Sequence, residues 1–538
     1  SSTYPSLLVL RHHRRRGAAA GELPATARRA EHHVRAGYER LLGYQHDSGA
    51  FTYWGGASEP DLALTAYALR FLHDAGEVLE VDEDATLRAR DYVLAQQQPD
   101  GSWSADAKAP AHTLALTAYV ARVLASYEAA KGANDKGAHK TDAETAKASD
   151  ALKRALDFLS RHAEKTGDPY ALASYALAAR DSGRHEAARA AAVKLAALRR
   201  DVAGDTFWDT TNTTPFNGWG HAGRIEATAL VLKALVVNCG MATADCGLKG
   251  VDGGAASAAA NRQLINGGLL YLLRHKDEHG VWYSTQATVN VLDALATLPS
   301  NPSNDVARDA QAAASSARAA TAEVFVNSRH VGSLALPAEG ELSAPLSLDI
   351  TRFVNAPGVN RVEIKRPAGA GRAAAQVVTN YYVPWSDAPD VAPLTKDARG
   401  TGAPAGARAA GRPLLKIAFD RTEGQAGRPV TCRVEVSRGA SLGGGMLLAE
   451  VGLPPGAEVD RASLERASKK SGAFLDRYDV LPDRLVLYVW PHQDKAASFE
   501  FEFTPRYGLR ALTAPSQVYD YYNPEARTVV PPTRFVIR

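Results

Sequence analysis

The sequence has few cysteines, few aromatic residues, little net charge and no long apolar run. Aromatic residues make up 7% of the chain, which argues against a cavity that must stabilise carbocations. A formal net charge of +3 gives no reason to expect nucleic acid or a membrane surface as a partner. No apolar stretch approaches the roughly 20 residues of a membrane span. The best candidate, residues 225–237, is interrupted by Glu226 and Lys233. The chain is therefore expected to be globular, with about three domains by length.

The three cysteines predict at most one disulfide and no metal centre. Cys239 and Cys246 lie close together in a glycine-rich stretch and could form a disulfide in an oxidising compartment. Cys432 lies in a strand-like stretch and is interpreted as a small buried apolar residue. No histidine cluster stands near any of them at metal-ligand spacing. We expect no metal and no cofactor.

A sequence pattern repeats in the first half of the chain with an offset of 52 residues. The string Leu-Ala-Leu-Thr-Ala-Tyr stands at residues 62–67 and again at residues 114–119. A glycine closely followed by an aromatic residue recurs at the same offset, at residues 49–51 and 101–103. Two independent features with one offset indicate a structural repeat. Weaker copies lie at residues 168–179, 226–235 and 286–295.

Each repeat predicts two helices of different character. Residues 62–72 are apolar almost all round, which predicts a helix buried on every side. Ala89, Tyr92, Val93 and Gln96 follow the spacing of a one-sided helix. Alternation of the two kinds predicts an inner and an outer ring, hence a closed α/α toroid over residues 1–300, with an open solenoid as the alternative. The string at residues 96–103 resembles the repeats of terpene cyclases and protein prenyltransferases, which are α/α toroids.

A short β module is predicted next, over residues 321–386. Its β-rich runs lie at residues 324–326, 346–348, 362–364 and 377–383. Linkers rich in small residues are predicted on either side, at residues 299–320 and 387–413.

The last module, residues 413–538, predicts a β-sandwich. Apolar and polar residues alternate over residues 430–436 and 499–503, as expected of strands with one face on a core and one in solvent. A short helix is predicted at residues 462–468 between strands. The fold class is therefore multidomain α + β.

Five stretches of the chain resemble, in order, the C-terminal portion of the alpha-2-macroglobulin and complement thioester-protein family, most closely its bacterial members. They are residues 37–44, 64–69, 97–101, 284–288 and 518–522, the last being Val-Tyr-Asp-Tyr-Tyr. The resemblance implies that the toroid is a thioester-type domain and that the middle module is a CUB-like segment. It also implies that the last module is a receptor-binding-type sandwich.

Members of this family carry an internal thioester between a cysteine and a glutamine three residues later. The chain itself lacks that motif, because Ala242, Lys249 and Glu435 stand three residues after its cysteines. Family members place the motif just before a helix that resembles residues 3–8. We therefore expect Cys-x-x-Gln to be encoded immediately upstream of Ser1.

A histidine of the thioester domain steers the reaction in complement members. It attacks the thioester first and directs it toward hydroxyl groups. His112 follows the Pro-Asp-Gly turn at residues 99–101 at a similar distance and is the candidate for this role. The residues alone also allow His112 to cap or flank a helix that begins near Thr113, and His221 is a rival candidate.

The resemblance implies a fragment of a macroglobulin-like endopeptidase inhibitor that traps proteases, and not an enzyme with catalytic residues of its own. Target proteases are the implied partners of the full-length protein, and a periplasmic or extracellular location is implied, although no signal peptide is present in the sequence. The oligomeric state does not follow from the sequence.

Two other functions are open on the residues alone. A toroid enzyme, such as a terpene cyclase, needs an Asp-rich acid motif, and residues 82–85 come nearest but lack the last carboxylate. A glycosidase needs two carboxylates across a cleft, and Glu59, Asp61 and Glu226 stand near the starts of inner helices. A non-covalent adhesion or binding scaffold is the third hypothesis.

Overall fold

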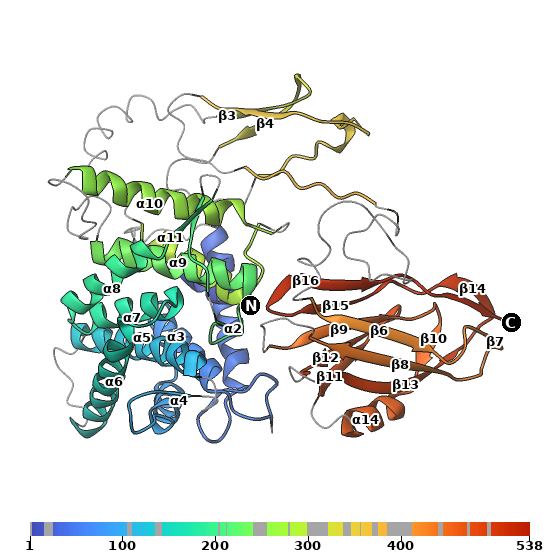
Figure 1. The fold of residues 1–538 in the computed structure, drawn as a ribbon, viewed down its shortest axis with the longest axis horizontal. Coiled ribbons are helices and arrows are strands. Elements are labelled where there is room, and N and C mark those ends of the chain that lie inside the picture. The colour runs from blue at the N-terminus through green and yellow to red at the C-terminus, as the bar shows by residue number, and fades with distance from the viewer. Residues whose placement is uncertain are drawn as a thin grey trace. The chain divides into compact units, whose positions relative to one another are not determined.

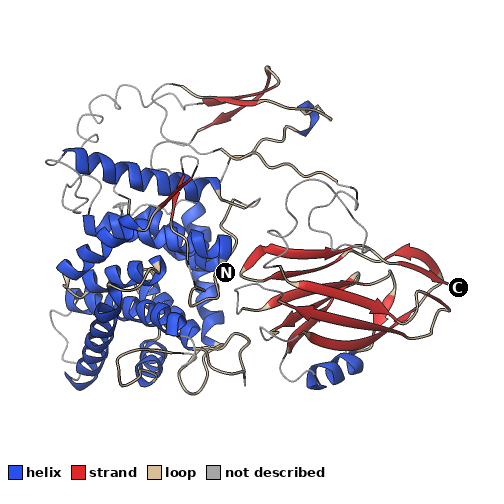
Figure 2. Ribbon diagram, in the orientation of Figure 1, coloured by secondary structure: helices blue, strands red, loops and turns tan. Residues whose placement is uncertain are grey.

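The structure is a computed structural model of the chain, and it divides into two compact units. The first comprises Ser1–Leu42, Asp74–Val81 and Ala296–Val378, and the second Gly43–His73, Asp82–Leu295 and Thr379–Arg538. Apart from one hairpin, the described elements before residue 300 are helices, and those after it are mostly strands; Figure 2 distinguishes the two kinds. The description leaves out residues 1–2, 16–24, 57, 105–109, 135–141, 203–204, 211, 240–254, 278–279, 299–320, 337–345, 356, 368–374, 383, 385–411, 439–444, 471–473 and 492–495.

The first unit combines a helical pair with a small sheet. Its elements are α1 (Thr3–Arg15), α2 (Ala25–Leu42), β3 (Thr321–Val326), β4 (Arg329–Ala335), the 3₁₀ turn η2 (Thr351–Phe353) and β5 (Val362–Lys365). The sheet is antiparallel in the order β4-β3-β5. Arg11 on α1 binds both Asp74 (2.9 Å) and Glu77 (2.6 Å), and the Tyr4 hydroxyl donates to Asp74. These bonds tie α1 to the turn that follows α3.

The helices of the second unit follow the predicted repeat. They are α3 (Leu62–Ala75), α4 (Glu83–Ala95), α5 (Pro110–Asn134), α6 (Asp142–Ala163), α7 (Pro169–Asp181), α8 (His185–Ala197), α9 (Gly220–Cys239), α10 (Ala255–Arg274) and α11 (Thr285–Ala296), with the hairpin β1 (Arg200–Val202) and β2 (Asp205–Phe207) between α8 and α9. Figure 1 shows these helices in sequence from blue to green.

The odd-numbered helices from α3 to α11 form a closed inner ring. His73 on α3 meets the Tyr127 ring on α5 edge-on, and α5, α7 and α9 pack in succession. Asp293 on α11 then pairs with Lys233 on α9 and with Arg70 on α3, each at 2.8 Å, which returns the ring to its first helix. The closed toroid was the correct choice over an open solenoid.

The inner and outer helices differ in burial as the sequence predicted. Every residue from Pro169 to Ala179 on α7 is buried. On the outer helix α4, by contrast, only one side is buried, with Ala89 and Val93 in its centre. Gln96, predicted to belong to that buried side, is instead the exposed C-cap residue just beyond the helix.

A repeated turn closes the end of the inner helices α3, α5, α9 and α11, and its first two copies are the ones that share the 52-residue offset. The backbone N–H of Phe51 donates to Thr65 Oγ1, and that of Trp103 donates to Thr117 Oγ1, both at 2.9 Å. The aromatic side chain thereby lies over the start of the inner helix, and we call such a side chain a plug. Trp208 and Trp282 make the same bond to Thr228 and Thr288, at 3.1 and 3.2 Å.

The glycine of this turn is required by both its conformation and its surroundings. Gly49 and Gly101 have φ values of +86° and +93°, a region that residues with a Cβ rarely adopt. A Cβ at Gly101 would also stand 2.5 Å from the carbonyl oxygen of Arg154, and one at Gly49 2.5 Å from that of Arg88. Each turn is thus pressed against the next outer helix.

The remainder of the second unit is the predicted β-sandwich. Its strands are β6 (Leu414–Phe419), β7 (Glu423–Gly424), β8 (Val430–Ser437), β9 (Leu447–Gly452), β10 (Ala457–Val459), β11 (Leu475–Val480), β12 (Arg484–Val489), β13 (Ala497–Pro505), β14 (Leu509–Leu512), β15 (Ser516–Asp520), β16 (Asn523–Val530) and β17 (Arg534–Ile537). They form sheets in the orders β10-β13-β8-β6, β11-β12-β9-β15-β16 and β14-β17-β7.

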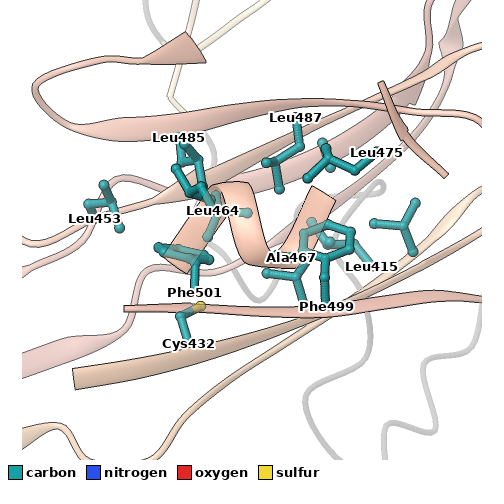
Figure 3. Packing of buried hydrophobic residues seen from close by; sticks show 14 of the residues in the cluster. Leu415, Cys432, Leu453, Leu464, Ala467, Leu475, Leu485, Leu487, Phe499 and Phe501 are labelled. Carbon is teal, nitrogen blue, oxygen red and sulfur yellow. The ribbon is translucent and has the colours of Figure 1, made fainter. Parts of the chain in front are cut away.

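The alternating residues meet in one apolar core between the two larger sheets. Cys432 on β8 and Phe501 on β13 are register partners, and both are buried (Figure 3). The predicted helix exists as α14 (Arg461–Lys470), and it contributes Leu464 and Ala467 to the same core. Burial raises the pKa of the Cys432 thiol, so the prediction of a small buried apolar residue is confirmed.

Two strand predictions in the middle module are wrong. Residues 346–348 and the described residues of 377–383 form no strand, whereas β3 and β5 contain the other two predicted runs. Val377 and Val378 are about half exposed, so these apolar side chains are not buried in a core of the described residues. The predicted linkers at 299–320 and, except for its last two residues, 387–413 lie outside the described part of the chain.

Candidate functional site

His112 and Asp61 lie at the N-terminal ends of two neighbouring inner helices. Asp61 immediately precedes α3, where its carboxylate accepts a hydrogen bond from the backbone N–H of Leu64 at 2.7 Å, as an N-cap residue does. Burial raises the pKa of Asp61, while nearby His112, when protonated, favours the ionised carboxylate. His112 is half-buried in the first turn of α5. A titratable imidazole and a carboxylate therefore share this end of the ring.

The rival histidine lies in an aromatic cluster. His221 is in the first turn of α9, and its ring packs against His275 and Tyr283, each with centroids 5.0 Å apart. Tyr271 completes the cluster by packing against His275 at 4.1 Å. These contacts give His221 a packing role, whereas His112 faces an acid.

The Val-Tyr-Asp-Tyr-Tyr stretch forms the turn between β15 and β16. Asp520 is buried and accepts hydrogen bonds from the backbone N–H groups of Tyr522 (2.8 Å) and Asn523 (3.0 Å), which shape the turn. The same carboxylate accepts from Trp219 Nε1 at 3.0 Å and lies 3.7 Å from the guanidinium of Arg438. Burial raises the pKa of Asp520, against these stabilising contacts.

The tyrosines of this turn take part in polar contacts with toroid residues of the same unit. The Tyr522 hydroxyl is hydrogen-bonded to that of Tyr53, and Asn217 also bonds to Tyr522. Burial raises the pKa of Tyr522 to about 12, so its hydroxyl is protonated at neutral pH. Tyr521 stays about half exposed beside it. The sequence analysis used this stretch only for its family resemblance and did not predict these partners in the toroid.

Trp54 is a site residue that sequence reasoning missed. Its Nε1 donates to Asp476 Oδ2 at 2.7 Å, and the guanidinium of Arg477 lies 5.4 Å from the centre of its ring. Tyr488 packs against it edge-on. Trp54 is 40% exposed in the structure. Its sequence signal was a further aromatic residue only three positions after Phe51, the plug of the first repeat.

Two of the acidic residues considered for an enzyme, Asp82 and Glu226, have structural roles, one in capping a helix and one in the interior. Asp82 is the N-cap of the outer helix α4, where it accepts from the backbone N–H groups of Asp84 and Ala85. Glu226 lies buried within α9, and Gly218 covers it so closely that a Cβ there would stand 2.6 Å from Glu226 Oε1. Burial raises the pKa of Glu226 to about 8, so the side chain is largely protonated at neutral pH.

Cys239 is the last residue of α9 and is buried, rather than lying within a loop. Cys246 lies outside the described residues, so their disulfide stays a prediction. In the part of the chain that the structure describes, no cluster of histidine, cysteine and acidic side chains suited to a metal is found. The described helices also include none with the length and apolarity of a membrane span.

Comparisons with known proteins define the class of this fold. The family model for the A-macroglobulin TED domain matches residues 2–298, and the model for the A-macroglobulin receptor binding domain matches residues 444–531. Since the first match covers more than half of the chain, the chain belongs to the alpha-2-macroglobulin and complement thioester-protein family, and it corresponds to the family's C-terminal portion.

Solved structures of two bacterial alpha-2-macroglobulins are similar to it. Native Escherichia coli alpha-2-macroglobulin, from domain MG7 to the C-terminus, is 14% identical with a TM-score of 0.54; the match covers 99% of this chain and 72% of that one. Salmonella alpha-2-macroglobulin reacted with methylamine is 15% identical with a TM-score of 0.54, over 100% of this chain and 29% of that one. At these identities the likeness concerns the fold. No curated protein sequence matches the chain.

Proposed function

We propose that the chain is part of a macroglobulin-type endopeptidase inhibitor that traps proteases, and that it is not an enzyme. Family membership and the order of the two matched domains support the proposal. Target proteases are the partners of the full-length protein in this proposal, and its location is periplasmic or extracellular. The domains in this proposal are the toroid at 1–300, the CUB-like segment at 321–386 and the receptor-binding-type sandwich at 413–538.

His112 is proposed as the residue that steers the thioester. The observation that supports it is its position near Asp61, with which it interacts electrostatically at the shared end of two inner helices. The thioester itself comes from outside these 538 residues, since none of the three cysteines is followed by glutamine at the third position. Cys432 in particular is buried within the sandwich core.

Covalent capture by the full-length gene product tests this function. The protein is mixed with a protease and a fluorescent primary amine, and products are separated on a denaturing gel. We expect a conjugate that survives boiling in detergent, formed only after the protease has cut the inhibitor. An upstream sequence without Cys-x-x-Gln, or a protein that forms no conjugate, would overturn the proposal.

Nucleophile preference tests His112 separately. The ratio of labelled glycerol to labelled methylamine incorporated is measured in the full-length protein and in its His112→Ala and His221→Ala variants. We expect His112→Ala to lower the share of hydroxyl product strongly, because the nucleophile that attacks the thioester first is lost, and His221→Ala to leave it unchanged. An unchanged ratio in His112→Ala would remove His112 from the reaction without affecting protease capture.

A further inference from the structure

The centre of the inner ring contains more positive than negative charge. Asp293 on α11 accepts from Arg70 Nη2 and from Lys233 Nζ through the same oxygen, Oδ2, at 2.8 Å each. These two cations lower the pKa of Asp293 far below its usual value despite its burial. One carboxylate thus already forms ion pairs with two cations, and its single negative charge cannot also neutralise a third.

Arg122 on α5 is that third cation. It is 6% exposed, and its guanidinium carbon lies 5.3 Å from the centre of the Tyr119 ring. Neither Nη1 nor Nη2 has a hydrogen-bond partner in the structure. Burial and the neighbouring charge of Arg70 both lower the pKa of Arg122, which shows that its surroundings oppose the charge. An arginine remains protonated even so, because its pKa starts above 12.

The acidic residues that interact with Arg122 do not fully compensate its charge. Glu226 is buried and largely protonated at neutral pH. Asp181 interacts electrostatically with Lys233, Arg180 and Arg122 at once, so its single charge is shared among three cations. Burying an unpaired guanidinium costs several kcal/mol, and four Nη hydrogens left without acceptors add to that cost. A water molecule would satisfy the hydrogens but would leave the charge.

We propose that the toroid binds a small monovalent anion of halide size at its centre, held by Nη1 and Nη2 of Arg122. The anion neutralises the third cation and accepts the hydrogen bonds that the protein leaves open. Small size follows from the burial of Arg122 itself and of the Tyr119 ring beside it. Chloride is the abundant anion of this class. The proposal does not depend on protease trapping.

Diffraction from crystals of the chain grown in bromide gives the direct test. We expect an anomalous peak within hydrogen-bond distance of the Arg122 Nη atoms. A fully occupied water with no anomalous signal at that position, or bromide at surface arginines alone, would overturn the proposal. This measurement needs no variant, so it decides the question even if a substitution at Arg122 prevents folding.

Thermal unfolding of the whole chain gives the second test, in sodium chloride or sodium gluconate at equal ionic strength. We expect chloride to raise the Tm of the helical part by about 2–4 °C, saturably. Arg122→Met should weaken the apparent affinity for chloride roughly 10-fold or more, as loss of a charged hydrogen bond does. Arg154→Gln, at an exposed arginine of α6, is the control and should keep the response. Equal Tm values in both salts for the unsubstituted chain would contradict the proposal.

Discussion

The interior of the helical ring and the interior of the β-sandwich are filled by different kinds of side chain. The sandwich core is a single apolar cluster that includes Phe499, Phe501 and Phe503 from one strand. The ring holds Asp293 and Arg122 among its inner helices, together with the protonated Glu226. Both interiors belong to the same compact unit. We therefore relate the difference in side chains to two separate roles, stability and the choice of neighbouring elements.

An apolar core stabilises by removing surface from water, whereas buried ion pairs add little net stability. Buried ion pairs make the packing of elements specific, because an incorrect neighbour would leave an unpaired charge inside the protein. Asp293 joins α11 to both α3 and α9, and these are the contacts that close the ring. We therefore interpret the polar interior as the feature that determines which helices are neighbours, and the apolar plugs as the main source of stability.

The largest expected effect is on the pH dependence of the ring's free energy of unfolding, and measuring it would sharpen this comparison. The pKa of Glu226 is about 8 in the folded chain, against an ordinary value of 4.5. Because the folded pKa is the higher one, its stabilisation is fully present below pH 4.5 and is lost as the pH rises to about 8. We expect a loss of roughly 5 kcal/mol over this range, and none of that slope in Glu226→Gln.

Denaturant unfolding followed by helical circular dichroism at several pH values measures this slope. Glu435→Gln, on the solvent side of β8, is the matched control in the sandwich and should retain the slope. A Glu226→Gln chain with the pH dependence of the unsubstituted one would show that Glu226 is not protonated inside the ring.

The second prediction concerns the apolar core. Phe501→Ala should destabilise the sandwich by about 3–5 kcal/mol, because it removes a buried ring and leaves a cavity. Phe501→Leu, which retains most of the volume, should cost less than about 2 kcal/mol. The loss is measured as a shift of the strand signal in denaturant unfolding. An equal shift of the helical signal would break the comparison, since the two regions would then unfold as one.

The smallest expected effect compares two glycines, one in each region. Gly101 and Gly427 have similar φ values of +93° and +79°, but a Cβ at Gly101 would strike the Arg154 carbonyl, whereas one at Gly427 meets nothing within 4 Å. Gly427→Ala should therefore cost about 1–2 kcal/mol from backbone strain alone, and Gly101→Ala clearly more. Equal losses in thermal unfolding would mean that the turn in the ring can move away from its outer helix.

Local patterns in the sequence predicted most of the fold. The 52-residue offset identified the repeat because the first two turns both bond to a threonine 14 residues later, Phe51 to Thr65 and Trp103 to Thr117. Alternation likewise located β8 and β13. Residues 377–383 are also rich in Val, Thr and Tyr, but their described part has no partner strand in the described part of the chain. Pairing is a property that a single segment cannot reveal.

Distant contacts explain what the sequence did not show. Trp219 meets Asp520 over 301 positions, and Arg70 meets Asp293 over 223. Arg122 offered one signal, a lone arginine in a helix otherwise predicted to be buried on every side. His112 was identified through a family resemblance, and its neighbour Asp61 was considered only as a possible enzyme carboxylate.

The tryptophan plugs of the ring have a consequence for how the toroid folds. Trp103 Nε1 donates to the carbonyl of Val93, and Trp282 Nε1 to that of Leu272, each ten residues earlier. Trp208 does the same with Leu195, thirteen residues earlier. Each of these three contacts closes a short loop that costs little chain entropy, so the contact order of these repeats is low. We therefore expect folding of the ring to start within such a repeat, and the meeting of α3 with α11, whose residues are most distant in the chain, to come late.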